Sequence, residues 1–193
     1  MYIFGYGSLM NSSSRQLTGQ TGAAIPAIVH GLVRHWSKID DSYVLSPLVV
    51  NKGQGQVNGV LLKVDDEALD EFDIRERGYH RIKLSPEQIE LNIDSKNHAE
   101  AFDSQQAIWV YINDEVIAPS QQSPIVQSYV DTVMAGCLEV SEKFAEHFVT
   151  HTKGWHHPFE NDRHQPKYNK LAGVAEHHHS VIDGLLTDVR CEA

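Results

Sequence analysis

Hydrophobic and polar residues alternate in two different ways along the chain, which divides it into a strand-rich part and a helical part. Up to residue 112, short apolar runs carry β-branched residues, period-two stretches and glycine punctuation, which is typical of strands. The predicted strands cover residues 2–4, 24–39, 55–64, 80–85 and 107–112. Acidic residues open a predicted short helix at 65–72, and polar residues at 95–106 predict a hairpin connection. The pattern favours an antiparallel or mixed sheet.

The pattern changes to helical spacing after residue 122. Ser123 is placed to cap a helix and Pro124 falls at its favoured first position. Apolar residues then recur every three or four positions as far as Phe144, which predicts one long helix. From about residue 154 the chain is predicted to be irregular, with a last short helix or strand at 174–189.

Composition places the chain among ordinary globular proteins. Hydrophobic residues make up 41% of the 193 residues and charged residues 22%. A chain of this length buries a core within one domain, so residues 1–193 are predicted to form a single domain with an irregular C-terminal tail. No repeat or linker interrupts it.

Charge and cysteine content exclude several functions. The formal net charge is −10 and no stripe of Lys and Arg is present, which argues against a nucleic-acid partner. The two cysteines, Cys137 and Cys191, give no disulfide framework and fit a reducing compartment. No basic region precedes an apolar run at the N-terminus, and no run reaches the roughly 18 apolar residues of a membrane span. We therefore expect a cytoplasmic protein without a membrane partner.

The glycine-rich stretch FGYGSLM, residues 4–10, follows the first predicted strand directly. Successive backbone N–H groups in such a loop can bind an anion. The stretch lacks the GK[ST] of a phosphate-binding loop and the third glycine of a dinucleotide loop, so a smaller anion such as a carboxylate suits it better. A tight turn that merely needs glycine is the alternative. Ser8 as a nucleophile would need a partner histidine, because the residues around it do not form G-x-S-x-G.

A second candidate lies in LDEFDIRERGYHRIKL, residues 69–84, where four carboxylates crowd together. Asp70, Glu71 and Asp73 fit a solvated surface. Glu76 differs, because it falls just after the predicted helix and two residues before Gly78. A carboxyl group at such a junction, facing a cleft, can have its pKa raised toward neutrality and act as both base and acid.

The 12 histidines contain no spacing typical of a metal site. His147 and His151 lie four residues apart near the end of the predicted long helix, where they fit cations beside the negative end of the helix dipole. No metal is expected.

With FGYGSLM followed by DIRERGYHR, the sequence resembles the γ-glutamylcyclotransferase-like superfamily, which includes the ChaC-type glutathione-degrading enzymes. The first stretch is similar to the signature loop of that family, and the second to the segment that holds its catalytic glutamate. Tyr129 and Gly136 are spaced like a Tyr and a Gly of the corresponding helix. The resemblance covers roughly residues 2–145, and FENDRHQPKY is similar to the tail of some bacterial members.

The resemblance implies an α+β fold in which a small mixed β-barrel is flanked by helices. It implies that Glu76 shuttles protons without a cofactor and that Tyr129 lines the pocket. The γ-glutamyl group of the substrate would be held by the loop residues Phe4, Gly5, Tyr6, Gly7, Ser8 and Leu9. RERGY has a shorter Glu-to-Tyr interval than some ChaC-type segments, and Phe144 lies near a tyrosine of certain members, which leaves the identity of the substrate open.

The reaction implied is an intramolecular cyclisation. The α-amine of a γ-glutamyl amide attacks its own γ-carbonyl, closes a five-membered lactam, 5-oxoproline, and expels the free amine. Intramolecular geometry supplies an effective molarity of about 10⁵ M or more, so no enzyme nucleophile is needed. The candidate substrates are glutathione, γ-glutamyl amino acids and γ-glutamyl amines. Two alternatives remain open: a non-catalytic module that binds a carboxylate-bearing metabolite, and a hydrolase that uses Ser8.

Overall fold

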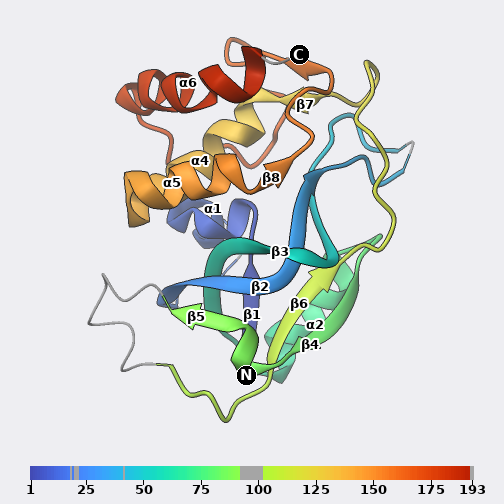
Figure 1. The fold of residues 1–193 in the computed structure, drawn as a ribbon, viewed down its shortest axis with the longest axis vertical. Helices are drawn as coiled ribbons and strands as arrows, with labels where there is room; N and C mark the ends of the chain where they lie inside the picture. Colours follow the sequence, from blue (N-terminus) through green and yellow to red (C-terminus); the bar gives the residue numbers. More distant parts are fainter. Residues whose placement is uncertain (18, 20–21, 41, 92–101, 192–193) are drawn as a thin grey trace.

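A computed structural model of the chain describes residues 1–17, 19, 22–40, 42–91 and 102–191. Its main feature is a seven-stranded mixed sheet (Figure 1). The strands run in the order β4-β6-β1-β3-β2-β5, and β8 pairs with β2 beside this path. Their bounds are β1 (Tyr2–Gly5), β2 (Ala24–Trp36), β3 (Leu48–Lys63), β4 (His80–Leu84), β5 (Ile89–Leu91), β6 (Ile108–Ile112) and β8 (Thr152–Lys153).

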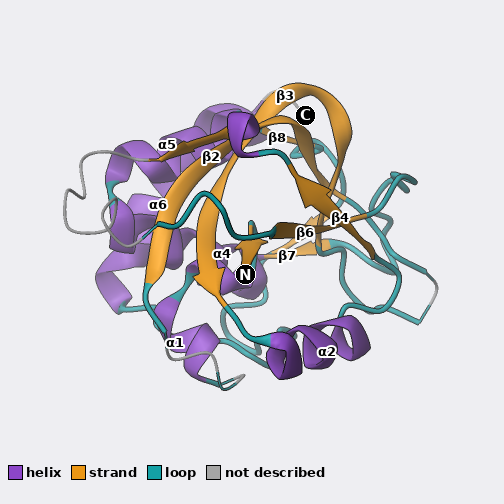
Figure 2. Cartoon of the chain, turned by 90° about the horizontal axis from the view of Figure 1, so that it is seen from below, coloured by secondary structure: helices purple, strands orange, loops and turns teal. Residues whose placement is uncertain are grey.

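The sheet curls into a half-barrel (Figure 2). Strand β1 lies at its centre, antiparallel to β3 and parallel to β6, and the terminal strands β4 and β5 do not pair with each other. The predicted α+β class with a mixed sheet and flanking helices is confirmed. The predicted small β-barrel is a half-barrel, because the short strands β4 and β5 at the two edges of the sheet do not pair with each other.

Two long strands give the sheet its curl. Strand β2 ends at Trp36, three residues before its predicted end, whereas β3 begins at Leu48, seven residues before its predicted start. They pair antiparallel from Ala24↔Leu62 to Trp36↔Leu48, with a bulge between His30 and Leu32. A bulge of this kind bends a strand and increases its twist. Of the predicted 95–106 connection, residues 95–101 lie outside the described residues.

Helices surround the half-barrel. They are α1 (Ser12–Gln16), α2 (Asp66–Arg75), α4 (Gln127–Val140), α5 (Glu142–Thr150) and α6 (Glu176–Cys191), with 3₁₀ turns η1 (Ser8–Met10) and η2 (Pro86–Gln88). Helices α4, α5 and α6 pack together at one end of the sheet (Figure 1). The sequence predicted either a helix or a strand at residues 174–189, and the structure has the helix α6 there. Among the described residues, no helix combines the length and the hydropathy needed to cross a bilayer.

The prediction of one long helix is wrong in two places. The residues after Pro124 form strand β7 (Ile125–Val126), which pairs in parallel with β9 (Phe159–Glu160), and the helix begins only at Gln127. Ser123 therefore caps no helix. The helix also breaks at Ser141, whose side chain accepts a hydrogen bond from the Phe144 N–H and starts α5 as a separate helix.

The hydrophobic core lies on both faces of β1. On one face, Tyr2 and Phe4 of β1 belong to a core cluster that includes residues of α4 and α5 and the buried rings of Trp36, Phe148 and Trp155. On the other face, Ile3 packs against Phe72 of α2. Burial on both sides fixes the position of β1, so the loop that leaves its C-terminal end and the end of α2 are held on a common rigid base.

Candidate active site

The glycine loop leaves β1 at Gly5 and turns at once into η1. An added Cβ at Gly5 would lie 2.7 Å from the Leu9 Cβ, and one at Gly7 would lie 2.9 Å from the Tyr129 hydroxyl oxygen. Both distances are shorter than ordinary contacts of a Cβ atom. The glycines are therefore required by close packing, and the second one lets Tyr129 reach the loop backbone.

Helix α4 supports the loop from behind. A Cβ at Gly136 would lie 2.6 Å from the Asn11 Cα and 2.6 Å from the Met10 carbonyl carbon, so only glycine lets the helix come this close. Asn11 donates a hydrogen bond to the Thr132 carbonyl oxygen at 3.0 Å and caps α1 by accepting from the Ser14 N–H at 2.9 Å. These contacts join the end of the loop to α4.

Arg34 of β2 supports the loop from inside the core. Its side chain is fully buried and packs over the Phe148 ring at 4.0 Å. Its guanidinium group donates to the Tyr6 carbonyl oxygen at 3.2 Å and to the Asn58 carbonyl oxygen at 2.8 Å. Burial lowers the pKa of Arg34 to about 9, so the group stays charged at neutral pH. The sequence prediction missed this arginine.

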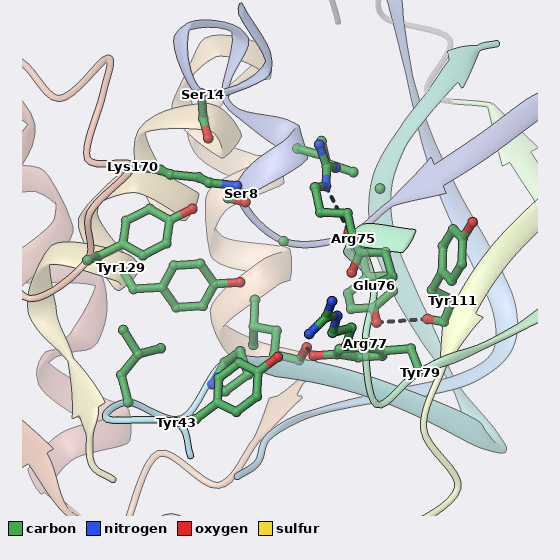
Figure 3. Close-up of a pocket in the computed structure, with 18 of the residues that line it drawn as sticks. Ser8, Ser14, Tyr43, Arg75, Glu76, Arg77, Tyr79, Tyr111, Tyr129 and Lys170 are labelled. Carbon is green, nitrogen blue, oxygen red and sulfur yellow. Dashed lines mark hydrogen bonds and ion pairs between the residues drawn. The ribbon is translucent and has the colours of Figure 1, made fainter. Parts of the chain in front are cut away.

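Glu76 follows the last residue of α2. Its backbone N–H donates to the Phe72 carbonyl oxygen at 2.9 Å, which closes the helix, and its own carbonyl oxygen accepts from the Tyr79 N–H at 3.2 Å. Gly78, at φ +83°, makes the tight turn between them. The helix end and this turn direct the Glu76 side chain toward the loop (Figure 3).

A pocket of about 440 Å³ lies between the glycine loop and Glu76 (Figure 3). Every site residue predicted from the sequence lines it: Phe4, Gly5, Tyr6, Gly7, Ser8, Leu9, Glu76 and Tyr129. Among the described residues, no histidine lines this pocket, so the Ser8 hydrolase alternative has no base here. Asp70, Glu71 and Asp73 lie outside it, and Asp73 instead accepts from the Tyr111 hydroxyl at 2.6 Å.

Tyrosine rings form much of the pocket wall: Tyr6, Tyr43, Tyr79, Tyr111, Tyr129 and Tyr168. The Tyr6 hydroxyl donates to the Tyr111 carbonyl oxygen at 2.8 Å, and the Tyr79 hydroxyl donates to the Leu48 carbonyl oxygen at 2.9 Å. Burial raises the pKa of Tyr6, Tyr79 and Tyr129, and the Glu76 charge raises it further in each case. These hydroxyls therefore stay neutral at physiological pH.

Burial also changes the acidity of Glu76. It raises the pKa of the carboxyl group above its ordinary value, against the opposing effect of Arg75 and Lys170. The Arg75 Nε lies 3.5 Å from Glu76 Oε1. The pKa of Glu76 is thus closer to neutral pH than the pKa of a solvated glutamate. Such a pKa suits a group that accepts a proton and then returns it.

The C-terminal segment closes one side of the pocket with Lys167, Tyr168, Asn169 and Lys170. The buried Asp162 carboxylate holds this segment, accepting from the Ser128 N–H at 2.7 Å, the Ser128 hydroxyl at 2.6 Å and the Lys167 N–H at 2.7 Å. The sequence prediction missed these wall residues. Their signal was the FENDRHQPKY stretch, which contains Asp162, Lys167 and Tyr168.

The histidine pair of α5 differs from its sequence interpretation. His147 and His151 stack with ring centroids 3.9 Å apart. Burial lowers the pKa of His147 to about 4, so at neutral pH it is not the cation that was expected at the helix end. In the part of the chain that the structure describes, no three His, Cys, Asp or Glu side chains are grouped to hold a metal ion.

The model of one protein family, described as gamma-glutamyl cyclotransferase, AIG2-like, matches residues 3–129, more than half of the chain. The chain belongs to this family. The match contains the glycine loop, Glu76 and Tyr129 and ends before the C-terminal wall of the pocket. Compared by sequence alone, no curated protein matches the chain.

Several solved structures have a fold similar to that of this chain. A gamma-glutamyl cyclotransferase matches with a TM-score of 0.58 at 16% identity, over 95% of this chain and 98% of its own. An uncharacterized protein from Homo sapiens matches with a TM-score of 0.60 at 15% identity, over 94% of this chain and 97% of its own. YkqA from Bacillus subtilis matches with a TM-score of 0.53 at 19% identity, over 80% of this chain and 56% of its own. At these identities the likeness shows the fold.

Proposed function

We propose that the protein converts a γ-glutamyl amide to 5-oxoproline and a free amine, with Glu76 as the general base and acid. One observation carries this proposal: the Glu76 carboxylate and the backbone of the glycine loop line the same pocket. Membership of the gamma-glutamyl cyclotransferase, AIG2-like family supports the reaction class.

The loop holds the γ-glutamyl group in this proposal. The first N–H groups of a 3₁₀ turn have no partner within the turn, and Ser8 and Leu9 of η1 line the pocket, so we assign the γ-glutamyl group to this end of the loop. The pocket fits a bound, folded substrate whose α-amine lies near its own γ-carbonyl carbon. Such positioning is the main catalytic requirement of an intramolecular attack.

Glu76 then moves protons between the two nitrogen atoms. The ionised carboxylate first removes a proton from the α-ammonium group, and the free amine attacks the γ-carbonyl carbon to form a tetrahedral oxyanion. The carboxylic acid next gives this proton to the leaving nitrogen as the C–N bond breaks and the carbonyl re-forms. The carboxylate then takes the second proton from the ring nitrogen and passes it to the released amine or to solvent, which leaves neutral 5-oxoproline. A raised pKa favours this exchange, because the group is then a better match for both proton transfers near neutral pH.

Tyr129 is the side chain that we assign to the oxyanion. The Tyr129 hydroxyl lies against the glycine loop, because a Cβ added at Gly7 would be only 2.9 Å from its oxygen. Because burial keeps this hydroxyl neutral, it can donate to the oxygen of the attacked carbonyl. Loss of one such donor lowers kcat by about 10²-fold or more in other enzymes.

The test is an assay for 5-oxoproline with glutathione and a panel of γ-glutamyl amino acids and γ-glutamyl amines. We expect the wild-type protein to cyclise at least one compound and Glu76→Gln to lose at least about 10²-fold in kcat. Glu71→Gln is the matched control, because Glu71 is exposed on the same helix and lies outside the pocket. It should retain wild-type activity.

Two results would overturn the proposal. Glu76→Gln as active as Glu71→Gln would remove Glu76 from the chemistry. A wild-type protein that binds panel compounds and releases no 5-oxoproline would instead identify the non-catalytic binding module.

A further inference from the structure

The charges that line the pocket differ in sign from the protein as a whole. The chain has a formal net charge of −10, yet Arg75, Arg77, Lys167 and Lys170 line the pocket, and Glu76 is its single carboxylate among the described residues. A cationic pocket in an anionic protein attracts anionic ligands and raises their association rate. The pocket is therefore built for a substrate with net negative charge.

Two of the four cations are already paired. The Lys167 ammonium lies 2.6 Å from the Glu160 carboxylate, and the Arg75 Nε lies 3.5 Å from Glu76. Lys170 and Arg77 form no ion pair with any residue that the structure describes. Two cationic side chains thus remain for a ligand.

Lys170 is a half-buried member of the C-terminal wall. The buried Asp162 carboxylate fixes the start of its segment, and the Tyr168 N–H donates to the Ser128 hydroxyl at 3.1 Å just before it. In Figure 3 the Lys170 side chain extends toward Ser8 of the glycine loop. Its charge also reaches Glu76, because it lowers the pKa of that carboxyl group. Lys170 therefore faces the place assigned to the γ-glutamyl group.

Arg77 lies across the pocket from Lys170, on the side of Tyr43 and Tyr79 (Figure 3). It is exposed at the pocket rim and lies close enough to Tyr43 to lower the pKa of that hydroxyl. A group bound near Arg77 would extend away from the loop and past Glu76. This is the direction in which the amine released from the γ-carbonyl would lie.

We propose that Lys170 and Arg77 bind two carboxylates of one substrate, which is therefore a γ-glutamyl amino acid or peptide rather than a γ-glutamyl amine. Lys170 pairs with the α-carboxylate of the γ-glutamyl group, and Arg77 pairs with a carboxylate of the leaving amino acid. This inference rests on the proposed function for the orientation of the substrate. A γ-glutamyl amine without a carboxylate would leave Arg77 without an anionic partner.

Binding titrations test the charge assignment independently of turnover. Three ligands are compared. The first is γ-glutamyl-alanine, and the second is γ-glutamyl-alaninamide, which lacks the carboxylate of the leaving amino acid. The third, the head carboxamide, is γ-glutamyl-alanine in which the α-carboxylate of the γ-glutamyl group is replaced by a carboxamide. They are titrated by calorimetry into Glu76→Gln protein, alone and combined with Lys170→Gln, Arg77→Gln or Lys143→Gln. Lys143 is an exposed residue of α5 outside the pocket and controls for net charge.

We expect Lys170→Gln to weaken γ-glutamyl-alanine and its alaninamide equally, by about 10- to 100-fold, and to leave binding of the head carboxamide unchanged. Because Arg77 is exposed to solvent, its ion pair with the carboxylate of the leaving amino acid should contribute less to binding than the ion pair of Lys170. We expect the parent Glu76→Gln protein to bind γ-glutamyl-alanine about 2- to 5-fold more tightly than γ-glutamyl-alaninamide, and Arg77→Gln should abolish this preference. Added salt should reduce the preference in the parent protein. Lys143→Gln should change neither.

The inference fails if the parent protein binds γ-glutamyl-alanine and its alaninamide equally well. The assignment of the two cations fails if Lys170→Gln, rather than Arg77→Gln, removes the preference. If wild-type protein binds a compound but releases no 5-oxoproline from it, the proposed reaction is overturned and the charge assignment is not. The titrations measure binding and do not depend on turnover.

Discussion

Arg34 donates a hydrogen bond to the carbonyl oxygen of Tyr6, 3.2 Å away, and so joins the glycine loop to the interior of the protein. The other acceptors of its guanidinium group are the Asn58 backbone and side chain, the Thr152 hydroxyl and the Phe148 carbonyl oxygen. All of these acceptors are neutral. A buried charge thus holds the loop through hydrogen bonds alone, which makes the loop position depend on their geometry.

Arg34→Lys should weaken both the fold and the site. Lysine lacks the planar fork, so at least one buried carbonyl oxygen loses its donor, at about 1–3 kcal/mol of unfolding free energy. A small shift of the loop should lower kcat/KM by about 10-fold or more. Urea denaturation and steady-state kinetics measure the two effects.

The matched control for this substitution is Arg190→Lys. Arg190 also packs over an aromatic ring, that of Phe159 at 3.8 Å, and donates to the Trp155 carbonyl oxygen, but it lies outside the pocket. Equal loss of kcat/KM in both variants would contradict a specific role of Arg34 in positioning the loop.

Gly136→Ala should destabilise the protein by about 1–3 kcal/mol, because its methyl group would overlap the backbone of Met10 and Asn11. Gly184→Ala is the control in another helix, where an added Cβ has no neighbour within 4 Å. It should stabilise the protein by about 0.5–1 kcal/mol, because alanine is the better helix former. Thermal or urea unfolding measures the change in unfolding free energy of each variant. A change of the same sign in both variants would contradict the packing argument.

The acidic limb of the pH profile of kcat/KM should report Glu76. The active base is the ionised carboxylate, so activity is lost as pH falls through its pKa, and burial places that pKa above the ordinary value of about 4.3. Arg75→Gln removes a charge that opposes this rise, and the limb should move to still higher pH. Lys143→Gln should leave it in place. A limb that moves down in Arg75→Gln would contradict the assignment.

Ser8→Ala should impair binding more than chemistry. The Ser8 side chain lines the pocket and lies close enough to the Tyr168 hydroxyl to lower its pKa, and the mechanism gives Ser8 no covalent step. We expect KM to rise by about 3- to 10-fold while kcat stays within about threefold, as for the loss of one hydrogen bond. Complete loss of turnover in a folded variant, checked against Ser180→Ala on the exposed face of α6, would restore Ser8 as a candidate nucleophile.

The parts of the site that the sequence predicted are those specified locally. Two glycines within three residues and a glutamate just before a glycine turn are visible in short windows, so the loop and Glu76 could be found. Helical periodicity was less informative. Phe144 lies four residues after Val140, so the apolar spacing continues through the break at Ser141, where only a serine followed by an acidic residue marks a new helix start.

The parts that the sequence did not predict depend on contacts between distant segments. Arg34 sits in an apolar strand and contacts Thr152, 118 residues later, and no short window contains both. The C-terminal wall likewise depends on Asp162 reaching Ser128, 34 residues earlier. Whether the strands close a barrel also depends on the relative positions of β4 and β5 in space, which strand patterns do not define.

The attachment of the C-terminal segment through Asp162 also sets when the pocket can form during synthesis. Chains fold from the N-terminus as they leave the ribosome. The glycine loop, Glu76 and the whole half-barrel up to β6 are made well before Tyr168 and Lys170, which complete the wall. A nascent chain can therefore complete this pocket only after residues 167–170 have been synthesised.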